Sequence, residues 1–181
     1  CLGFFNKNIE TIEIPAWDCL PYDRVSPRSD LVGRRLLSLI SIAGKLSNQA
    51  VILITVNALL QRVPCREVLS TASFDLNVGS DLNTEELFSY LECNGFDRVG
   101  SVMQIGDFAV RGGIIDIFAP GRLEPVRLDL FGTTIESIRE FDPITQRSNV
   151  KIENLQLVPV SEVTLDSKTI ENFCSGYRLE F

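Results

Sequence analysis

The chain has 181 residues, of which 45% are hydrophobic and 23% charged, so it is long and apolar enough to bury a substantial core. Its formal net charge of −7 disfavours a surface dedicated to nucleic acid, because phosphate binding requires clustered Lys and Arg. Histidine is absent, which excludes His triads, His general bases and His metal ligands.

The five cysteines are scattered along the chain without a C-x-x-C pair. This odd number and wide spacing favour reduced thiols in the cytoplasm over a disulfide framework or a zinc site. The sequence contains no signal peptide and no apolar stretch long enough to cross a membrane. It starts at Cys1 and stops at Phe181 without a leader or tail, so we expect a fragment of a longer protein.

The first 70 residues predict part of a parallel α/β layer. Ser29 or Asp30 is the expected cap of a helix whose apolar side holds Val32, Leu36, Leu39, Ile40 and Ala43. The run AVILITV at 50–56 is typical of a strand buried on both faces in a parallel sheet. The predicted order is a strand at 9–15, a loop at 17–27, a helix at 31–43, a strand at 50–56 and a short helix at 57–62.

From about residue 70 the pattern changes to that of a small α+β domain. Asn83, followed three residues later by Glu86, predicts the start of a helix, and Gly95 predicts its end. One helix beside consecutive antiparallel strands defines the α+β class. The predicted order is a strand at 74–78, a helix at 84–94, strands at 98–105, 109–118, 126–131, 134–141 and 151–160 with a turn at 142–145, and a last helix at 166–177.

Residues 114–131 predict a hairpin whose outer face docks another protein. Side chains alternate across a strand, so the second strand has a buried aliphatic face and an outer face. The buried face holds Val126, Leu128 and Leu130, and the outer face holds Arg127, Asp129 and Phe131, with Asp116 and Phe118 sharing one face of the first strand. An arginine, a carboxylate and a large aromatic are together typical of recognition surfaces. We therefore expect Arg127 on the solvent side, where truncation to Ala leaves folding nearly intact.

A nucleotide site is poorly supported. Gly44-Lys45 is the only Gly-Lys pair, but Leu39 and Leu46 stand where a P-loop requires a glycine and a Ser or Thr. Gly44 more simply ends a helix.

A metal site is also poorly supported. Asp116 and Asp129 suggest an acid pair or a Mg²⁺ site if they face each other across the hairpin, but charge compensation by neighbouring arginines on a solvated sheet face is the better explanation. Gly112-Gly113 fits a β-bulge or a tight bend better than a phosphate-binding loop. We expect no catalytic residue, metal ligand or cofactor in this chain.

Four segments carry a resemblance to a known family. They are LPYDRVSPRSDLVGRRLLSL (20–39), VNALLQRV (56–63), GDFAVRGGIIDIF (106–118), and PVRLDLFG with IESIREFDPITQRS (125–148). In this order and spacing they resemble the N-terminal region of the bacterial transcription-repair coupling factor family, which is similar to the excision-repair helicase UvrB. The resemblance covers most of the chain.

The resemblance implies a partial, helicase-like domain 1A at 1–70, an inserted UvrA-binding α+β domain 2 at 71–160, and the start of domain 1B at 161–181. Carried over by position, the UvrA-contacting residues of the family fall on Arg111, Arg127 and Phe131. The implied function is that of a non-enzymatic adaptor of transcription-coupled nucleotide excision repair. In the bacterial cytoplasm it would recruit the damage-recognition ATPase UvrA to stalled transcription complexes.

Other activities of the family belong to parts that this chain lacks. The resemblance implies that ATP and Mg²⁺ serve the motor domains of the full-length protein, that RNA polymerase and DNA are bound through other domains, and that no membrane is involved. It also implies that a C-terminal domain of the full-length protein covers the UvrA-binding face.

Two alternatives stay open. The first is a fragment of a UvrB-type excision-repair helicase that handles DNA and ATP. UvrB carries a long tyrosine-rich insertion before the first helix, whereas here Ser26-Pro27 runs almost directly into that helix, which argues against this alternative. ATP binding by the isolated chain would favour it. The second is a structural scaffold whose hairpin face packs on a neighbouring domain.

Overall fold

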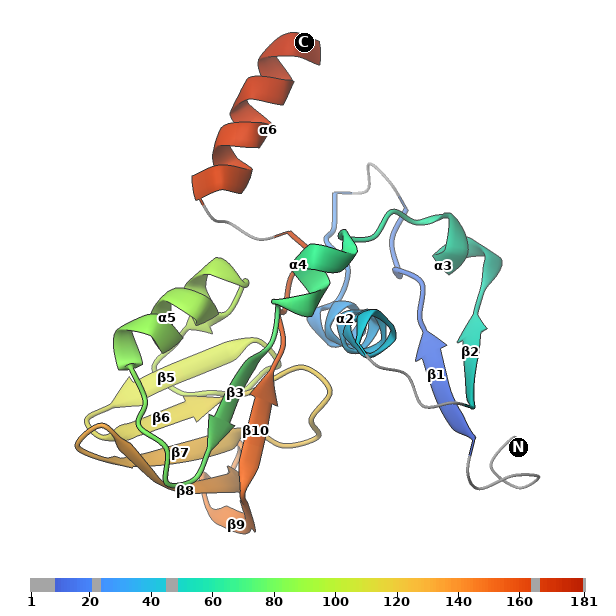
Figure 1. Cartoon of the computed structure of the whole chain (residues 1–181). Coiled ribbons are helices and arrows are strands. Elements are labelled where there is room, and N and C mark those ends of the chain that lie inside the picture. The colour runs from blue at the N-terminus through green and yellow to red at the C-terminus, as the bar shows by residue number, and fades with distance from the viewer. Residues whose placement is uncertain (1–8, 21–23, 45–48, 164–166, 181) are drawn as a thin grey trace.

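The computed structural model describes residues 9–20, 24–44, 49–163 and 167–180. Cys1, Lys45, Leu46 and Asp166, which the sequence predictions name, lie outside these ranges. Two units stand side by side, a parallel strand pair with its helices and a larger α+β unit, and helix α2 lies between them (Figure 1). A parallel unit followed by a largely antiparallel sheet agrees with the predicted fold class.

The N-terminal unit is built on two parallel strands, β1 (Glu10–Ile14) and β2 (Ala50–Ile54), joined through helix α2 (Ser29–Ala43). The predicted apolar side of α2 is confirmed: Val32 and Leu36 are buried with Leu69, and Leu39, Ile40 and Ala43 pack around them. Gly44 ends the helix, as predicted. Two short helices complete the unit, α3 (Val56–Leu60) and α4 (Arg66–Ser70), of which the second was not predicted.

Two details of this unit differ from the predictions. Neither Ser29 nor Asp30 caps α2, because the cap position is Arg28, whose side chain holds Asp30 in a two-point ion pair. Strand β2 is not buried on both faces: among the described residues β1 is its only strand neighbour, and Ile52, Leu53 and Ile54 are exposed.

The α+β unit contains one six-stranded sheet and one two-stranded sheet. The larger sheet runs in the order β4-β5-β6-β7-β8-β9, and its pairs are antiparallel except for the parallel pair β4 and β5. Its strands are β4 (Asp97–Arg98), β5 (Asp107–Arg111), β6 (Ile114–Ile117), β7 (Val126–Phe131), β8 (Thr134–Phe141) and β9 (Ser148–Ile152). The smaller sheet pairs β3 (Phe74–Asn77) antiparallel with β10 (Asn154–Leu157).

Three predicted strands need correction. The strand predicted at 98–105 is almost entirely a loop, because only the short strand β4 pairs there. The segment 109–118 is two strands separated by a tight bend at Gly112-Gly113, where Gly112 has a φ of +61°. The segment 151–160 divides between β9 and β10, which belong to different sheets.

Helix α5 (Thr84–Cys93) covers one face of the six-stranded sheet (Figure 1). The predicted cap is confirmed, because Asn83 Oδ1 accepts hydrogen bonds from the backbone N–H groups of Glu85 (3.2 Å) and Glu86 (3.4 Å). Leu87 and Leu91 of the helix are fully buried in the main core. That core also contains Val126, Leu128, Ile115 and Ile117 of the sheet, so the aliphatic face predicted for residues 126–130 is the inner face.

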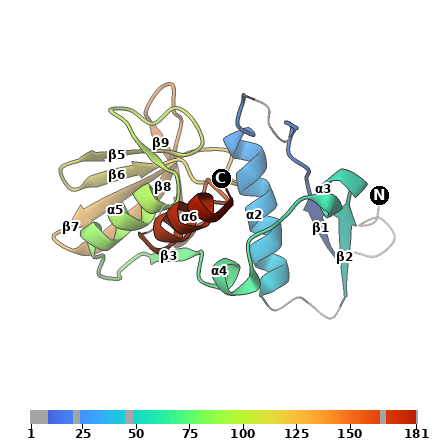
Figure 2. The ribbon, with the colours of Figure 1, turned by 90° about the horizontal axis from the view of Figure 1, so that it is seen from above.

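Close backbone packing joins the two units where α2 meets the turn between β6 and β7. A Cβ atom on Gly33 of α2 would lie 2.1 Å from Pro120 Cβ, and one on Gly121 would lie 2.1 Å from Leu37 Cδ1. The close approach to the rigid proline requires Gly33, whereas Gly121 is required by its φ of +80° and faces only the flexible end of the Leu37 side chain. Seen from above, α2 separates the strand pair from the sheet (Figure 2).

A buried ion pair also connects the two units at helix α2. Arg35 of α2 is 0% exposed, and its Nε lies 3.0 Å from Glu162 Oε1, which also accepts a hydrogen bond from Trp17 Nε1 (3.0 Å). Arg35 Nη1 donates to the carbonyl of Pro15 at 3.0 Å. Glu162, which follows the α+β unit in the chain, thus contacts two residues that precede that unit.

The last helix, α6 (Ser167–Glu180), projects away from both units (Figure 1). Phe173 and Tyr177 are exposed on it, with ring centroids 6.0 Å apart. In the part of the chain that the structure describes, no helix has the length and apolar character needed to cross a membrane.

Candidate protein-docking site

The outer face of the six-stranded sheet, opposite α5, is the candidate site. Its side chains form rows that run across neighbouring strands, as the register of the pairs fixes. The central row consists of Ala109, Asp116, Arg127, Arg139 and Lys151, each directly opposite the next. Three cations therefore stand side by side on β7, β8 and β9, which we call the cationic row.

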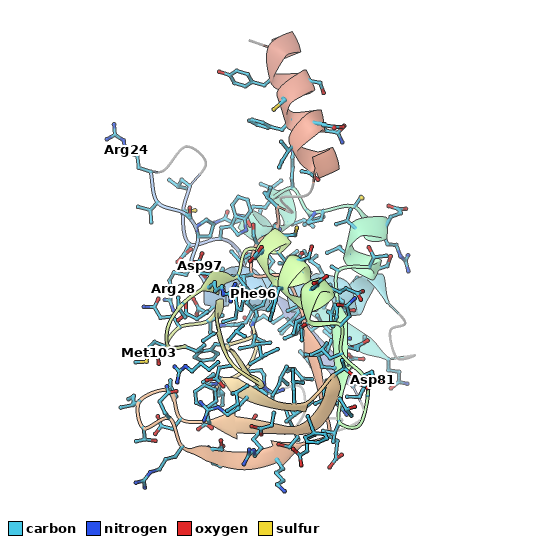
Figure 3. All side chains as sticks on the ribbon, turned by 90° about the vertical axis from the view of Figure 1, so that its left-hand side faces the viewer. Arg24, Arg28, Asp81, Phe96, Asp97 and Met103 are labelled. Atoms are coloured by element: carbon cyan, nitrogen blue, oxygen red, sulfur yellow. The ribbon has the colours of Figure 1, made fainter. Side chains whose placement is uncertain are left out.

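Part of the outer face is covered. The loop at 99–106, most of which lies in the strand predicted at 98–105, folds over it, and Val102 is fully buried against Ala109, Phe118 and Phe141. Asp107 Oδ2 holds this loop by accepting hydrogen bonds from two of its backbone N–H groups, at 2.9 and 2.8 Å. Met103 of the loop is exposed and points away from the body of the molecule (Figure 3).

Arg127 lies on the outer face of β7, as predicted, but its side chain is largely covered there and is not freely exposed to solvent. Its Nε and Nη2 donate to the two carboxylate oxygens of Asp116, at 2.7 and 2.8 Å. The side chain of Arg127 is 15% exposed and that of Asp116 only 1%. The guanidinium also lies over the ring of Phe141, 4.5 Å from its centroid. The alternation of β7 was predicted correctly, but Phe141 and the turn after it close over the arginine.

The turn at 142–147 supplies the remaining contacts of Arg127. Gln146 accepts from Arg127 Nη1 through its backbone oxygen (3.3 Å) and from Nη2 through its side-chain oxygen (3.4 Å). Its own amide donates to the carbonyl of Pro143 at 2.7 Å. Among the described residues other than glycine, Gln146 alone has a positive φ, of +59°. Nothing in the local sequence predicted this contact, because it depends on the strained conformation of the turn.

Asp129 and Arg139 form a second pair beside the cationic row. Asp129 Oδ2 accepts from Ser137 Oγ at 2.6 Å and from Arg139 Nε at 3.1 Å. Partial burial raises the pKa of Asp129. The hydrogen bonds from Ser137 and Arg139, together with the charges of Arg139 and Arg127, lower the pKa by a larger amount. The pKa of Asp129 is therefore below its ordinary value. Asp116 and Asp129 do not face each other, because Asp129 lies opposite Ile114. Charge compensation is confirmed, although the face is not solvated at Asp116.

Phe131 and Arg111 are the exposed members of the predicted site. Phe131 is 80% exposed at the end of β7, and Arg111 ends β5 beside the tight bend at Gly112-Gly113. Arg111 Nη2 donates to the carbonyl of Gly100 at 2.7 Å, which ties it to the covering loop. The outer face thus carries Arg111, Arg127 and Phe131, but each stands in a different row and only two of them are accessible.

Two cavities lie between the two units and not on the outer face of the sheet. Their volumes are ≈ 240 and ≈ 350 Å³, and both are lined by Ser161 and Glu162. Among the described residues no group of three or more Cys, Asp or Glu is placed to hold a metal ion.

Residues 74–163 match the family model of the UvrB interaction domain. The α+β unit, with its outer face, is therefore the matched part, and the chain belongs to the proteins that carry a UvrB interaction domain.

The particular relatives are transcription-repair-coupling factors. The chain is 36% identical over 179 residues to the one from Rickettsia conorii, 34% over 165 residues to the one from Escherichia coli, and 37% over 158 residues to the one from Myxococcus xanthus. These alignments cover 98%, 91% and 87% of this chain, but only 16%, 14% and 13% of the respective relatives. The resemblance drawn from the sequence is confirmed.

Proposed function

We propose that this chain is a non-enzymatic adaptor of transcription-coupled nucleotide excision repair in the bacterial cytoplasm. It binds UvrA through the outer face of the six-stranded sheet and recruits it to stalled transcription complexes. The similarity to transcription-repair-coupling factors supports the pathway, and the UvrB interaction domain supports docking to a repair protein.

The observation that carries the docking site is that Phe131 and two members of the cationic row, Arg139 and Lys151, are accessible on the same face of the sheet. Phe131 at the end of β7 is 80% exposed, and the side chain of Arg139 on the neighbouring strand β8 is 36% exposed, so this face offers an aromatic and a cationic anchor. Central aromatic and arginine side chains supply much of the energy of protein interfaces. The opposite face of the sheet is closed by α5 and its core, so it cannot serve.

Within this proposal the three site residues have different roles. Phe131 and Arg111 contact UvrA directly, because both are exposed. Arg127 offers only the edge of its guanidinium that Asp116 does not hold.

The domain assignment is part of the proposal. Residues 1–70 correspond to domain 1A, 71–160 to domain 2 and 161–181 to the start of domain 1B of a UvrB-like region. The parallel pair β1–β2 and the separate antiparallel sheet support these boundaries. Translocation with ATP and Mg²⁺, and contacts with RNA polymerase and DNA, lie in other parts of the full-length protein, one of which masks the outer face.

The test is a binding titration of purified UvrA with the unchanged chain, Phe131→Ala and Phe173→Ala. Both substitutions remove an exposed phenylalanine, one from the outer face and one from α6. We expect about a tenfold or greater loss of affinity for Phe131→Ala and no loss for Phe173→Ala. Equal effects, or no binding by the unchanged chain, would contradict the docking site, and measurable ATP binding would favour the UvrB-type alternative.

A further inference from the structure

The guanidinium of Arg127 has two edges, and the chain holds them very differently. A guanidinium carries five N–H donors in a planar fork. Nε and one N–H of Nη2 form the side edge, which Asp116 holds with charge-assisted bonds of 2.7 and 2.8 Å. Nη1 and the other N–H of Nη2 form the end edge, whose hydrogen-bond partners among the described residues are the two neutral oxygens of Gln146, at 3.3 and 3.4 Å. These are longer than ordinary N–H···O hydrogen bonds.

Gln146 holds the end edge from a strained position. Its φ of +59° lies in the left-handed region, which is unfavourable for a residue with a Cβ atom. The turn that carries it is on the surface, and Ile144 within the same turn is exposed. The Gln146 amide donates to the Pro143 carbonyl at 2.7 Å, but the two contacts with Arg127 are long and the turn is on the surface, so these two contacts are the ones that a ligand can replace.

The surroundings of the end edge favour an anionic ligand. Arg139 and Lys151 continue the row from Arg127 across two further strands. The carboxylate of Asp116 is already paired with the side edge of Arg127, and the carboxylate of Asp129 already accepts hydrogen bonds from Arg139 and Ser137. A planar carboxylate matches the two parallel N–H groups of an arginine fork and forms shorter, stronger bonds than an amide oxygen does.

We infer that the end edge of Arg127 is a carboxylate-binding site, that Gln146 fills it in the unbound chain, and that an Asp or Glu side chain of the docking partner takes its place. The inference rests on the proposed function, since UvrA is the partner that brings the carboxylate. It assigns Gln146 the role of a neutral placeholder and leaves Asp116 to position the arginine.

The test titrates UvrA against the unchanged chain, Gln146→Glu, Gln146→Gly and Gln104→Glu. In Gln146→Glu a tethered carboxylate occupies the end edge, so UvrA affinity falls by about tenfold or more. Gln146→Gly removes the side-chain oxygen from the end edge, leaves only the backbone oxygen at 3.3 Å, and suits the positive φ, so this variant binds UvrA at least as tightly as the unchanged chain. Gln104→Glu adds the same charge on the exposed loop over the outer face, and its affinity changes less than about twofold.

The outcomes separate this inference from the proposed function. If the unchanged chain binds UvrA but Gln146→Glu binds as Gln104→Glu does, the placeholder inference is wrong and the docking site stands. If Gln146→Gly loses affinity tenfold, Gln146 is itself a contact and the inference is also wrong. If a thermal melt shows that Gln146→Glu does not fold, Gln146→Gly alone decides. If the unchanged chain does not bind UvrA at all, the proposed function fails first.

Discussion

Asp116 and Arg127 lie directly opposite each other on β6 and β7, and the two carboxylate oxygens each accept one hydrogen bond from the guanidinium. The carboxylate is almost completely buried, so its charge depends on the arginine for compensation. The hydrogen bond to Asp116 is also the main reason that the pKa of Arg127 is raised above its ordinary value. This residue, expected from the sequence as a surface anchor, is therefore also a structural one.

Arg127→Ala should destabilise the fold strongly. It leaves the buried carboxylate of Asp116 unpaired, and breaking a buried ion pair on one side typically costs about 3–5 kcal/mol. Chemical denaturation of the two chains measures the difference in free energy of unfolding. Adding Asp116→Ala to the same chain should recover part of the loss, because no buried charge is then left. A loss below about 0.5 kcal/mol for Arg127→Ala would show that the pair contributes little.

Asp129 should make stability depend on pH in the acidic range. Its folded pKa is lower than its ordinary value of about 3.9, so its contribution is complete above that value and is lost as pH falls through the folded pKa. The free energies of unfolding of the unchanged chain and Asp129→Asn should differ most at pH 7 and converge in acid. Asp142, whose pKa is lowered chiefly by the backbone N–H of Ile144, titrates in both chains and cancels. A constant difference across the whole range would rule out this linkage.

Gly121→Ala should cost more than Gly79→Ala, although both glycines have φ near +80°. The backbone penalty of roughly 1–2 kcal/mol applies to both substitutions. At Gly79 nothing lies within 4 Å of the added Cβ, whereas at Gly121 the Cβ would meet Leu37 Cδ1 at 2.1 Å. Thermal melts of the two variants give the comparison. Leu37→Ala should remove most of the extra penalty in the Gly121→Ala background, and equal melting temperatures for the two single variants would argue against close packing at this turn.

Glu162→Gln should weaken the joint between the two units. The substitution keeps an acceptor for Trp17 but removes the charge that compensates Arg35, whose Nε lies 3.0 Å from Glu162 and whose Nε and Nη2 have no hydrogen bond among the described residues. We expect a loss of about 3 kcal/mol or more in the free energy of unfolding. Arg35→Met combined with Glu162→Gln should be more stable than Glu162→Gln alone. If the single variant unfolds like the unchanged chain, the ion pair does not hold the units together.

The sequence predicted those features that depend on local periodicity. The five apolar positions of α2, the cap at Asn83 and the inward aliphatic face of β7 are each set by residues within a few positions of one another. The order of the strands followed from the turn residues between them, although boundaries shifted where a loop was read as a strand.

The accessibility of the site was not predictable in the same way. Alternation places Arg127 on the outer face, but its burial there is caused by Phe141 and Gln146, which come from the end of β8 and the following turn. Alternation also does not predict which residue of β7 lies opposite Asp116. The register of the hairpin decides this, and it places Arg127 there and not Asp129. Phe131 remains exposed to solvent because it lies at the end of β7, away from Phe141 and Gln146.

The pairing of β3 with β10 has a consequence for how this protein can be rearranged. Phe74 and Leu157 are register partners, so the chain enters and leaves the α+β unit at neighbouring points. A segment with adjacent ends can be excised, grafted into another host loop, or closed by a short linker and reopened elsewhere as a circular permutant. The surface that such a transplant would newly expose is the turn at Pro120 and Gly121, which α2 covers here. A host protein with a helix that carries a glycine opposite Pro120, as α2 carries Gly33 here, would cover this turn and leave the outer face of the unit unchanged.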